Sequence, residues 1–402
     1  MTREKKIIII TAVILSLIGV IIHIRGKASA GSAEVYMLGH ETVILGGDGA
    51  SSVGGYHNPI PEGPGVREIV MGYTCIGTQT LYDKILPAFE EYWEQQHGEK
   101  VRFITAWNGA GMDSISSVIY GKPIQVLLKT AQNNPYTRGY SATNWQKTRN
   151  RGIVYSYPYV FVVRKGNPKN IHTFADLTRP DVKVVHMDPM GTHGGITSVF
   201  LLYAAGLKDS EDRTGTKDKA AAGEYLRQVE ANALTGVTGE ATTRIFTQGD
   251  GDVLITLEVW AKQMIKNPNY EMVIPPNTYT TDIKVYKMKR NISKADEELV
   301  DAFIDFLFRE ESQEAFAGAG YRPSDPAVMA NHPEFAPMPG LIHMDYLGEQ
   351  TKALKEIILD KWVGIRNSEK PDDEKIKVVK IPDNKVPPED SNIMKQGVPE
   401  DQ

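Results

Sequence analysis

Cysteine is nearly absent from this chain of 402 residues, which holds only Cys75. A single cysteine excludes an intrachain disulfide, and no cysteine stands at the end of the N-terminal apolar run, where a lipid could be attached. The fold must therefore be held by packing, and a chain of this length can bury a large enough core.

Motifs for catalysis and metal binding are also lacking. The nine histidines are scattered, and neither a His-Glu-x-x-His motif nor a close His/Cys pair suggests a metal site. We find no phosphate-binding loop, kinase motif or Gly-x-Ser-x-Gly turn. Since no nucleophile and base can be paired, we expect neither an enzyme nor a resident cofactor.

Clustered basic charge is missing too. Once residues 1–30 are set aside, 40 basic and 49 acidic residues remain, which gives a net charge of −9. No basic patch stands out, so the sequence argues against a nucleic-acid partner.

One long hydrophobic run is present, at the N-terminus. The basic segment MTREKK precedes an apolar stretch from Ile7 to Ile24, and Ala28-Ser29-Ala30 follows as a cleavage-site pattern. Residues 1–30 thus have the order of an export signal, although the apolar stretch is also close to the length of a membrane anchor. Both interpretations place the body of the chain outside the cytoplasm, periplasmic or extracellular, and restrict membrane contact to the N-terminal segment, residues 7–24.

The body of the chain alternates short strands with helices. Residues 31–67 are rich in glycine and lack periodicity, which favours a tether or an irregular extension. From Arg67 onward we expect an α/β protein with mostly parallel sheets and helices on both faces. The first predicted helix, Thr80 to Gln96, contains Pro87, which should kink or split it. Residues 367–402 hold nine acids, six lysines and five prolines, a composition that predicts a mobile tail.

The segment from Val182 to Leu202, VKVVHMDPMGTHGGITSVFLL, is the most informative for function. It predicts a β-branched strand, a Gly-rich turn and a helix that starts near Thr192, Gly194 and Gly195. A helix start offers unpaired N–H groups and the positive end of the helix dipole, which together can hold an anion. Ordinary strand-to-helix turns have the same composition, so both interpretations stay open at this point.

Three other turns have a similar composition at similar junctions. We number the four turns in chain order. They are YTCIGTQT at 73–80 (first), WNGAGMDS at 107–114 (second), DPMGTHGG at 188–195 (third) and TGVTGEATT at 235–243 (fourth). Parallel strands place their carboxyl ends at one edge of a sheet, so the four turns should converge there. Backbone N–H and hydroxyl donors with few formal charges suit a small tetrahedral oxyanion. Helix caps favour the same residues, so this convergence is a hypothesis.

Longer stretches carry a family resemblance. They are YDKILPAFEEYW, SSVIYG, YVFVVRKGNPKNIHTFADLTRPDVKVV, the HGG turn, GDGDVLITLE and GYRPSDPAV. They resemble the sulfate/thiosulfate-type periplasmic solute-binding proteins of ABC importers, which have the type II periplasmic-binding-protein fold. The resemblance implies two α/β lobes joined by two crossover strands, with an anion between them. Lobe I would comprise residues 68–158 and 276–340, lobe II residues 159–275, and residues 341–402 would form a C-terminal extension.

The resemblance also implies a set of ligand-binding residues in the four turns. Departures from the family pattern lie among them, since His193 replaces a serine and Leu257 replaces a tryptophan that donates its indole N–H. Trp260 lies one helical turn beyond Leu257. The departures leave another oxyanion or an organic anion as alternatives to sulfate. A cation-bearing solute is a further alternative if Asp113 and Glu240, which lie beside the turns, face the cleft. The implied set is Thr74, Gly77, Thr78, Ala110, Gly111, Thr192, His193, Gly194, Gly195 and Thr238.

The expected function is that of an extracytoplasmic solute-binding protein. It would capture a small sulfate-like oxyanion by closing its two lobes and deliver it to the permease of an ABC transporter, as a monomer and without chemistry. A membrane-tethered receptor or sensor subunit is the second hypothesis, which applies if residues 7–24 are not cleaved. An enzyme on this fold is the third.

Overall fold

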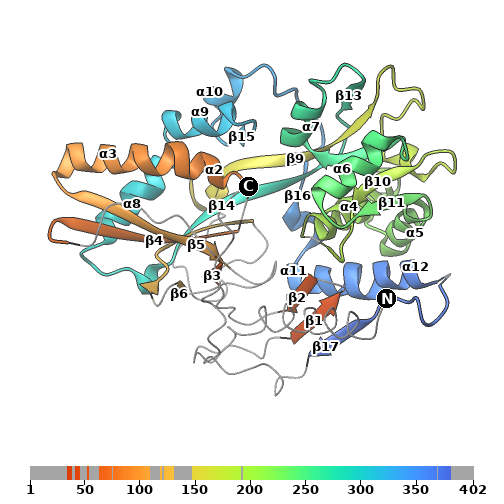
Figure 1. Cartoon of the computed structure of the whole chain (residues 1–402), viewed down its shortest axis with the longest axis horizontal. Helices are drawn as coiled ribbons and strands as arrows, with labels where there is room; N and C mark the ends of the chain where they lie inside the picture. The colour runs from red at the N-terminus through yellow and green to blue at the C-terminus, as the bar shows by residue number, and fades with distance from the viewer. Residues whose placement is uncertain are drawn as a thin grey trace, which may run out of the picture.

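One twelve-stranded sheet runs through both halves of the molecule (Figure 1). The computed structural model describes residues 34–38, 41–45, 52–53, 63–74, 76–108, 118–119, 122–130, 147–191, 193–368 and 370–381. The main path of the sheet is β11-β10-β12-β9-β14-β8-β4-β5-β3, and β13, β15 and β16 pair beside it. The strands are β3 Ser52–Val53, β4 Val66–Thr74, β5 Lys100–Asn108, β8 Val126–Thr130, β9 Ile153–Arg164, β10 Val184–Met187, β11 Ala233–Gly236, β12 Val253–Leu257, β13 Tyr270–Val273, β14 Tyr279–Lys287, β15 Arg322–Pro323 and β16 Ile342–His343.

Two long strands, β9 and β14, connect the halves across the middle of Figure 1. We call the half with β4, β5 and β8 lobe I, and the half with β10, β11 and β12 lobe II. β9 pairs with β14 up to Pro158 and with β12 from Tyr159 onward. β14 pairs with β9 and with β8 of lobe I. The two-lobed α/β architecture is therefore the one that the sequence predicts.

The helix after β4 contains a π-helical segment just before Pro87. It consists of α2 (Thr78–Thr80), the π-helical η1 (Leu81–Ile85) and α3 (Leu86–His97). Pro87 has no N–H to donate to the preceding turn, and the wider π turns lie directly before it. The predicted interruption at Pro87 thus takes the form of a π segment.

Helices pack on the sheet through aromatic and aliphatic side chains. In lobe I the Phe89 ring of α3 lies 5.1 Å from Phe303 of α8 and 6.0 Å from Phe103 of β5, between ring centroids. In lobe II, Val184 and Val185 are both fully buried and belong to clusters on opposite faces of β10, as expected for a parallel sheet covered on both sides. The other elements of the lobes are α4 His193–Thr214, α5 Lys219–Glu230, α6 Gly239–Gln248, α7 Glu258–Met264, α8 Glu297–Phe306, α9 Glu310–Gly318, α10 Pro326–Ala330, η3 Arg149–Gly152, η4 Phe174–Thr178, η5 Lys289–Asn291, η6 Met344–Leu347, β6 Val118–Ile119 and β7 Lys122–Pro123.

Segments from both ends of the chain form a separate layer beneath lobe II in Figure 1. β1 (Glu34–Leu38) pairs with both β2 (Glu41–Leu45) and β17 (Val378–Ile381) in a three-stranded antiparallel sheet. Before β17, the chain forms one long helix. It is made of α11 Gln350–Ala353, the π-helical η7 Leu354–Trp362 and α12 Val363–Asn367. We call η7 and α12 together the C-terminal helix.

Two expectations from the sequence are wrong for these residues. The irregular extension predicted over 31–67 contains β1, β2 and β3, and the mobile tail predicted from 367 contains β17. Composition misleads here because the backbone partners are distant in sequence for two of these pairings: β1 pairs with β17 from the opposite end of the chain, and β3 pairs with β5 of lobe I. The helix of residues 7–24 is a prediction that lies outside the described residues. Among the residues that the structure describes, no helix is both long and apolar enough to cross a membrane.

Candidate functional site

The third and fourth turns lie against each other at one edge of the lobe II sheet. Neighbouring parallel strands β10 and β11 lead into them, with Met187 beside Gly236. The Asp188 N–H donates to Gly236 O at 2.9 Å. A Cβ added to Gly191 would lie 2.3 Å from Val237 O, so the two backbones approach too closely for any side chain there. Two of the four predicted turns therefore do converge.

Gly195 has a packing role that the sequence did not reveal. It lies in the first turn of α4, and a Cβ on Gly195 would lie 2.1 Å from Asp188 O. The helix start thus sits directly on the backbone of the third turn, which explains this glycine without a ligand. Gly194 is half-buried, and its carbonyl accepts a hydrogen bond from Ser198 Oγ at 2.9 Å. Thr192 lies outside the described residues, and only the backbone of His193 is described.

Thr238 caps α6 at the fourth turn. Its Oγ1 accepts a hydrogen bond from the Ala241 N–H at 3.1 Å, which leaves the hydroxyl hydrogen able to donate elsewhere. α6 and α4 therefore begin beside each other, and each has a helix dipole whose positive end is at this edge.

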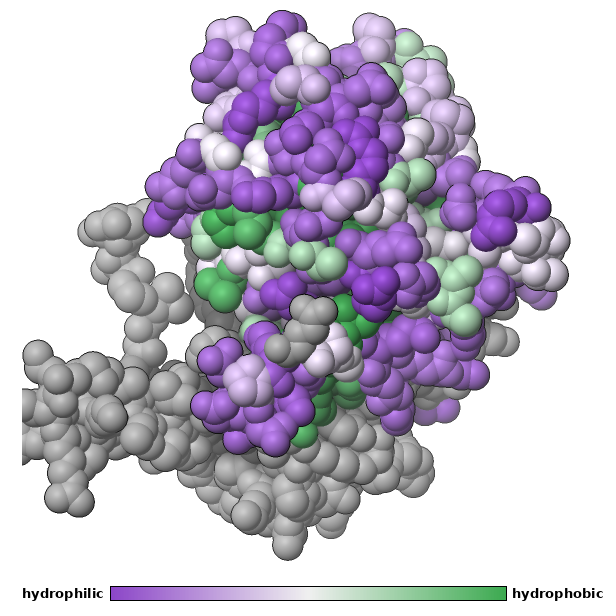
Figure 2. All heavy atoms as spheres, turned by 90° about the vertical axis from the view of Figure 1, so that its right-hand side faces the viewer, coloured by the Kyte–Doolittle hydropathy of each residue, from purple (hydrophilic) through white to green (hydrophobic). Residues whose placement is uncertain are grey.

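Two exposed apolar residues flank the fourth turn. Val237 is 52% exposed and Trp260 is 40% exposed, and they are the exposed large hydrophobic residues among those the structure describes. A Cβ on Gly239 would lie 3.7 Å from the Trp260 ring, so the indole stands at the start of α6. Leu257, by contrast, is buried in the core. Figure 2, which views lobe II from the side, shows a largely hydrophilic face with apolar residues in small areas between polar ones.

The first turn is held by tyrosines of lobe I. Gly77 has φ 91°, a left-handed conformation that favours glycine, and it precedes Thr78 at the start of α2. The Tyr155 hydroxyl donates to Ile76 O at 2.6 Å. A Cβ on Gly77 would also lie 3.2 Å from the Tyr321 ring.

The residue before Tyr321 lies close to a helix of lobe II. The next residue back, Gly320, is 3.1 Å from Val259 of α7 when measured from an added Cβ. Trp260, beside Val259, stands at the start of α6, next to the fourth turn. The first turn and the fourth turn are thus linked by a short path of packed residues. Of the remaining predicted residues, Thr74 is described only in its backbone, and Ala110 and Gly111 of the second turn lie outside the described residues.

A buried ion pair joins the lobes on this path. Arg322 of β15 donates through Nε to Glu258 Oε2 at 2.7 Å and through Nη2 to Glu258 Oε1 at 2.9 Å. Arg322 Nη2 also donates to Ala336 O at 2.8 Å. Lys262 Nζ lies 3.6 Å from Glu258 Oε1, and burial lowers the pKa of Lys262. The sequence singled out no role for Glu258, because its partner is distant in the chain.

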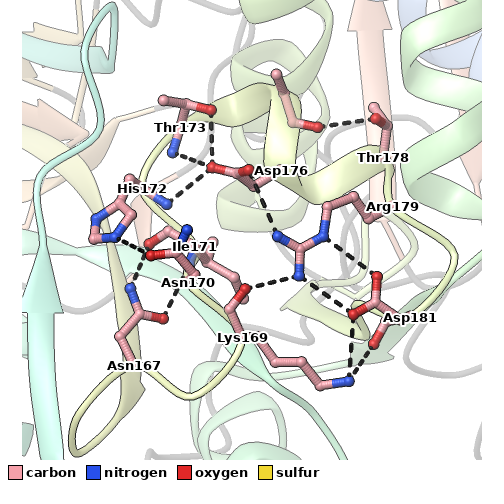
Figure 3. Close-up of polar contacts among 11 residues, drawn as sticks. Asn167, Lys169, Asn170, Ile171, His172, Thr173, Asp176, Thr178, Arg179 and Asp181 are labelled. Carbon is pink, nitrogen blue, oxygen red and sulfur yellow. Dashed lines mark hydrogen bonds and ion pairs between the residues drawn. The ribbon is translucent and has the colours of Figure 1, made fainter.

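The longest family-like stretch forms a polar network of its own (Figure 3). Asn167 donates through Nδ2 to Ile171 O and accepts the Ile171 N–H through Oδ1. The Asp176 carboxylate accepts the N–H groups of His172 and Thr173. Arg179 donates to Lys169 O at 2.7 Å and pairs with Asp181. These groups satisfy one another, so the stretch shapes the loop after β9.

The model of a known family, the bacterial extracellular solute-binding proteins, matches residues 71–322, which include the third and fourth turns. The chain belongs to this family. It is 30% identical to the sulfate-binding protein of Synechococcus elongatus over 307 residues, which cover 72% of this chain and 82% of that protein. The thiosulfate-binding protein of Pseudomonas aeruginosa is 26% identical over 260 residues, or 62% of this chain and 76% of that protein.

A solved structure supports the same assignment. The sulfate-binding protein SubI from Mycobacterium tuberculosis aligns with a TM-score of 0.52 at 25% identity, covering 73% of this chain and 99% of that one. In this solute-binding protein β1, β2, the C-terminal helix and β17 all lie outside the residues that the family model matches.

Proposed function

We propose that this solute-binding protein captures a small, sulfate-like oxyanion between its lobes and delivers it to the permease of an ABC importer, without chemistry. The observation that carries the proposal is the packing of the third turn on the fourth, which sets the starts of α4 and α6 side by side. Two helix starts at one sheet edge offer several N–H donors and partial positive charge to an anion. The relatives named for sulfate and thiosulfate support the same class of solute.

The proposed binding residues come from both lobes. Lobe II would contribute backbone N–H groups near Gly194 and Gly195 and the hydroxyl of Thr238, together with Thr192 and His193. Lobe I would contribute the turn around Gly77, with the remaining members Thr74, Thr78, Ala110 and Gly111. A solute other than sulfate is the alternative. Burial of Leu257 favours it, since Leu257 offers no donor where the family has a tryptophan.

A thermal-shift panel tests the proposal. Sulfate, thiosulfate, molybdate, tungstate, phosphate and small carboxylates are each added to the purified protein. A solute at a hundred times its Kd adds about 2.7 kcal/mol of stability, which raises the midpoint of unfolding measurably. The absence of any shift with every oxyanion would overturn the proposal, and a shift with carboxylates alone would identify the alternative.

The N-terminal run favours a second candidate, a receptor or sensor subunit tethered to the membrane by residues 7–24. Mass spectrometry of the mature protein from its host decides between them. A mature N-terminus near residue 31 would mean cleavage and a free binding protein, and an intact Ile7–Ile24 segment in the membrane fraction would mean a tether. We also propose that the protein acts as a monomer, which light scattering on the purified chain would check.

A further inference from the structure

A buried polar cluster lies beneath the third turn and includes part of the C-terminal helix. His186 of β10 is fully buried, and its Nε2 lies 3.3 Å from Glu230 Oε1 at the end of α5. Trp362 of the C-terminal helix donates its indole N–H to the same Glu230 oxygen at 2.9 Å. Arg366 Nη1 lies 3.4 Å from Glu230 Oε2. The cluster thus joins a strand and two helices that are far apart in sequence.

Two oxygen acceptors lie beside the nitrogens of the buried His186 ring. Nδ1 lies 2.9 Å from the carbonyl oxygen of Met187, which can only accept a hydrogen bond. Nε2 lies 3.3 Å from Glu230 Oε1, an ion-pair contact that lacks hydrogen-bond geometry. With an oxygen acceptor beside each ring nitrogen, the surroundings favour the imidazolium, which carries an N–H at both positions. Burial would lower the pKa of His186, but the Glu230 carboxylate outweighs burial and raises it. Burial would raise the pKa of Glu230, and His186 and Arg366 hold it below its usual range.

The cluster acts where the third turn begins. The carbonyl that His186 holds belongs to Met187, and the next residue, Asp188, makes the contacts that fix the turn. Asp188 donates its N–H to Gly236 O and accepts the Met190 N–H through Oδ1 at 2.8 Å. The orientation of the Met187–Asp188 peptide therefore sets where α4 and the fourth turn meet.

We propose that the C-terminal helix positions the third turn through Glu230 and His186, so that solute affinity depends on a segment outside the family match. This inference rests on the proposed function, because it assigns a positioning role within that site. Glu230, His186 and Trp362 touch no solute in this proposal. They hold the peptide from which the binding turn starts.

Two variants test the inference. Glu230→Gln keeps the shape of the side chain but removes the charge that favours protonated His186. Trp362→Phe keeps an aromatic side chain, although a smaller one, and removes the indole N–H donor. The control is Glu356→Gln, which breaks the exposed ion pair of Glu356 with Lys219 between the same two helices. Isothermal titration with sulfate and with thiosulfate gives Kd for each protein. We expect Kd to rise roughly 3- to 30-fold in both variants and to stay unchanged in the control.

A spectroscopic signal separates positioning from mere support of the fold. Histidine-selective NMR follows the ring protons over pH 5.5 to 9, and His186→Gln identifies the signal. We expect the wild-type ring to stay protonated above the pH at which the ring of Glu230→Gln loses its proton. In the wild type, affinity should fall as pH rises through the raised pKa of His186, and this fall should be absent in Glu230→Gln.

The outcomes are distinguishable. Variants that bind as tightly as the wild type at every pH, even if they unfold more easily, would show that the cluster only supports the fold. A wild-type protein that binds no solute would overturn the proposed function first, and this inference with it. Variants that fail to fold at all are separated from weak binders by circular dichroism, in which case Trp362→Phe, the milder change, decides.

Discussion

Two buried glutamates of this protein each form an ion pair, one with an arginine and the other with a histidine. Glu258 pairs with Arg322 across the two lobes, and Glu230 pairs with His186 within lobe II. Both carboxylates have side chains only 1% exposed. An arginine stays charged at every accessible pH, whereas a histidine can lose its charge near neutrality. The cation between the lobes therefore keeps its charge near neutral pH, whereas the cation beneath the third turn can lose it.

Loss of the arginine should be the largest single effect on stability. Arg322→Ala leaves Glu258 buried with only Lys262 nearby, so we expect the free energy of unfolding to fall by about 3–5 kcal/mol. Urea denaturation measures it. Arg244 is exposed, and Arg244→Ala should change stability by less than about 0.5 kcal/mol. Equal losses in the two variants would contradict the role given to the ion pair.

Gly195→Ala should have the next largest effect, confined to lobe II. The new methyl group would meet Asp188 O at 2.1 Å, so the start of α4 must shift, at a cost of about 1–3 kcal/mol and with weaker solute binding. Gly364 of the C-terminal helix offers a matched control, because a Cβ there meets nothing within 4 Å. Gly364→Ala should stabilise the protein by about 0.5–1 kcal/mol. Calorimetry gives the unfolding midpoint of each variant. An unchanged midpoint in Gly195→Ala would argue against close packing of Gly195 on the Asp188 carbonyl.

The pH dependence of stability separates the two ion pairs directly. The pKa of His186 is raised above 6.5, so its contribution is fully present below that pH and is lost as pH rises through the raised value. The pKa of Glu230 is lowered below 4.5, so its contribution is lost only as pH falls through that lower value. Glu230→Gln should flatten the decline in stability above neutral pH, and Arg322→Ala should leave that decline intact. Parallel slopes in all three proteins would contradict the comparison.

The smallest effect is expected at the surface. Glu356→Gln breaks a pair whose side chains are 62% and 39% exposed, and such pairs contribute about 0–1 kcal/mol. Added salt should weaken the wild-type contribution further. A loss above 2 kcal/mol by chemical denaturation would mean that the C-terminal helix is held mainly by its surface contacts and not by Glu230.

Local patterns predicted the two-lobed α/β fold and the meeting of the third and fourth turns. The third and fourth turns followed from strand patterns that end in Gly- and Thr-rich junctions, because both features depend on neighbours in sequence. The reason for Gly195 could not be predicted, since it is a contact with the Asp188 carbonyl that exists only once α4 is placed. His186, Glu230 and Trp362 carry no local signal, and their meeting depends on the C-terminal helix. β1 and β17 were missed because they pair with each other from opposite ends of the chain, and β3 was missed because its partner is β5 of lobe I.

The pairing of β1 with β17 has a consequence for the order of assembly. A chain that crosses a membrane with its N-terminus first presents β1 and β2 long before the residues of β17 arrive. Closing so long a loop is slow and entropically costly, so the three-stranded sheet should be the last part to form. The C-terminal helix, which directly precedes β17, would dock at the same late stage. A chain truncated or stalled before β17 would then have nearly complete lobes but no closed terminal sheet, and that sheet would mark a chain whose export has proceeded through β17.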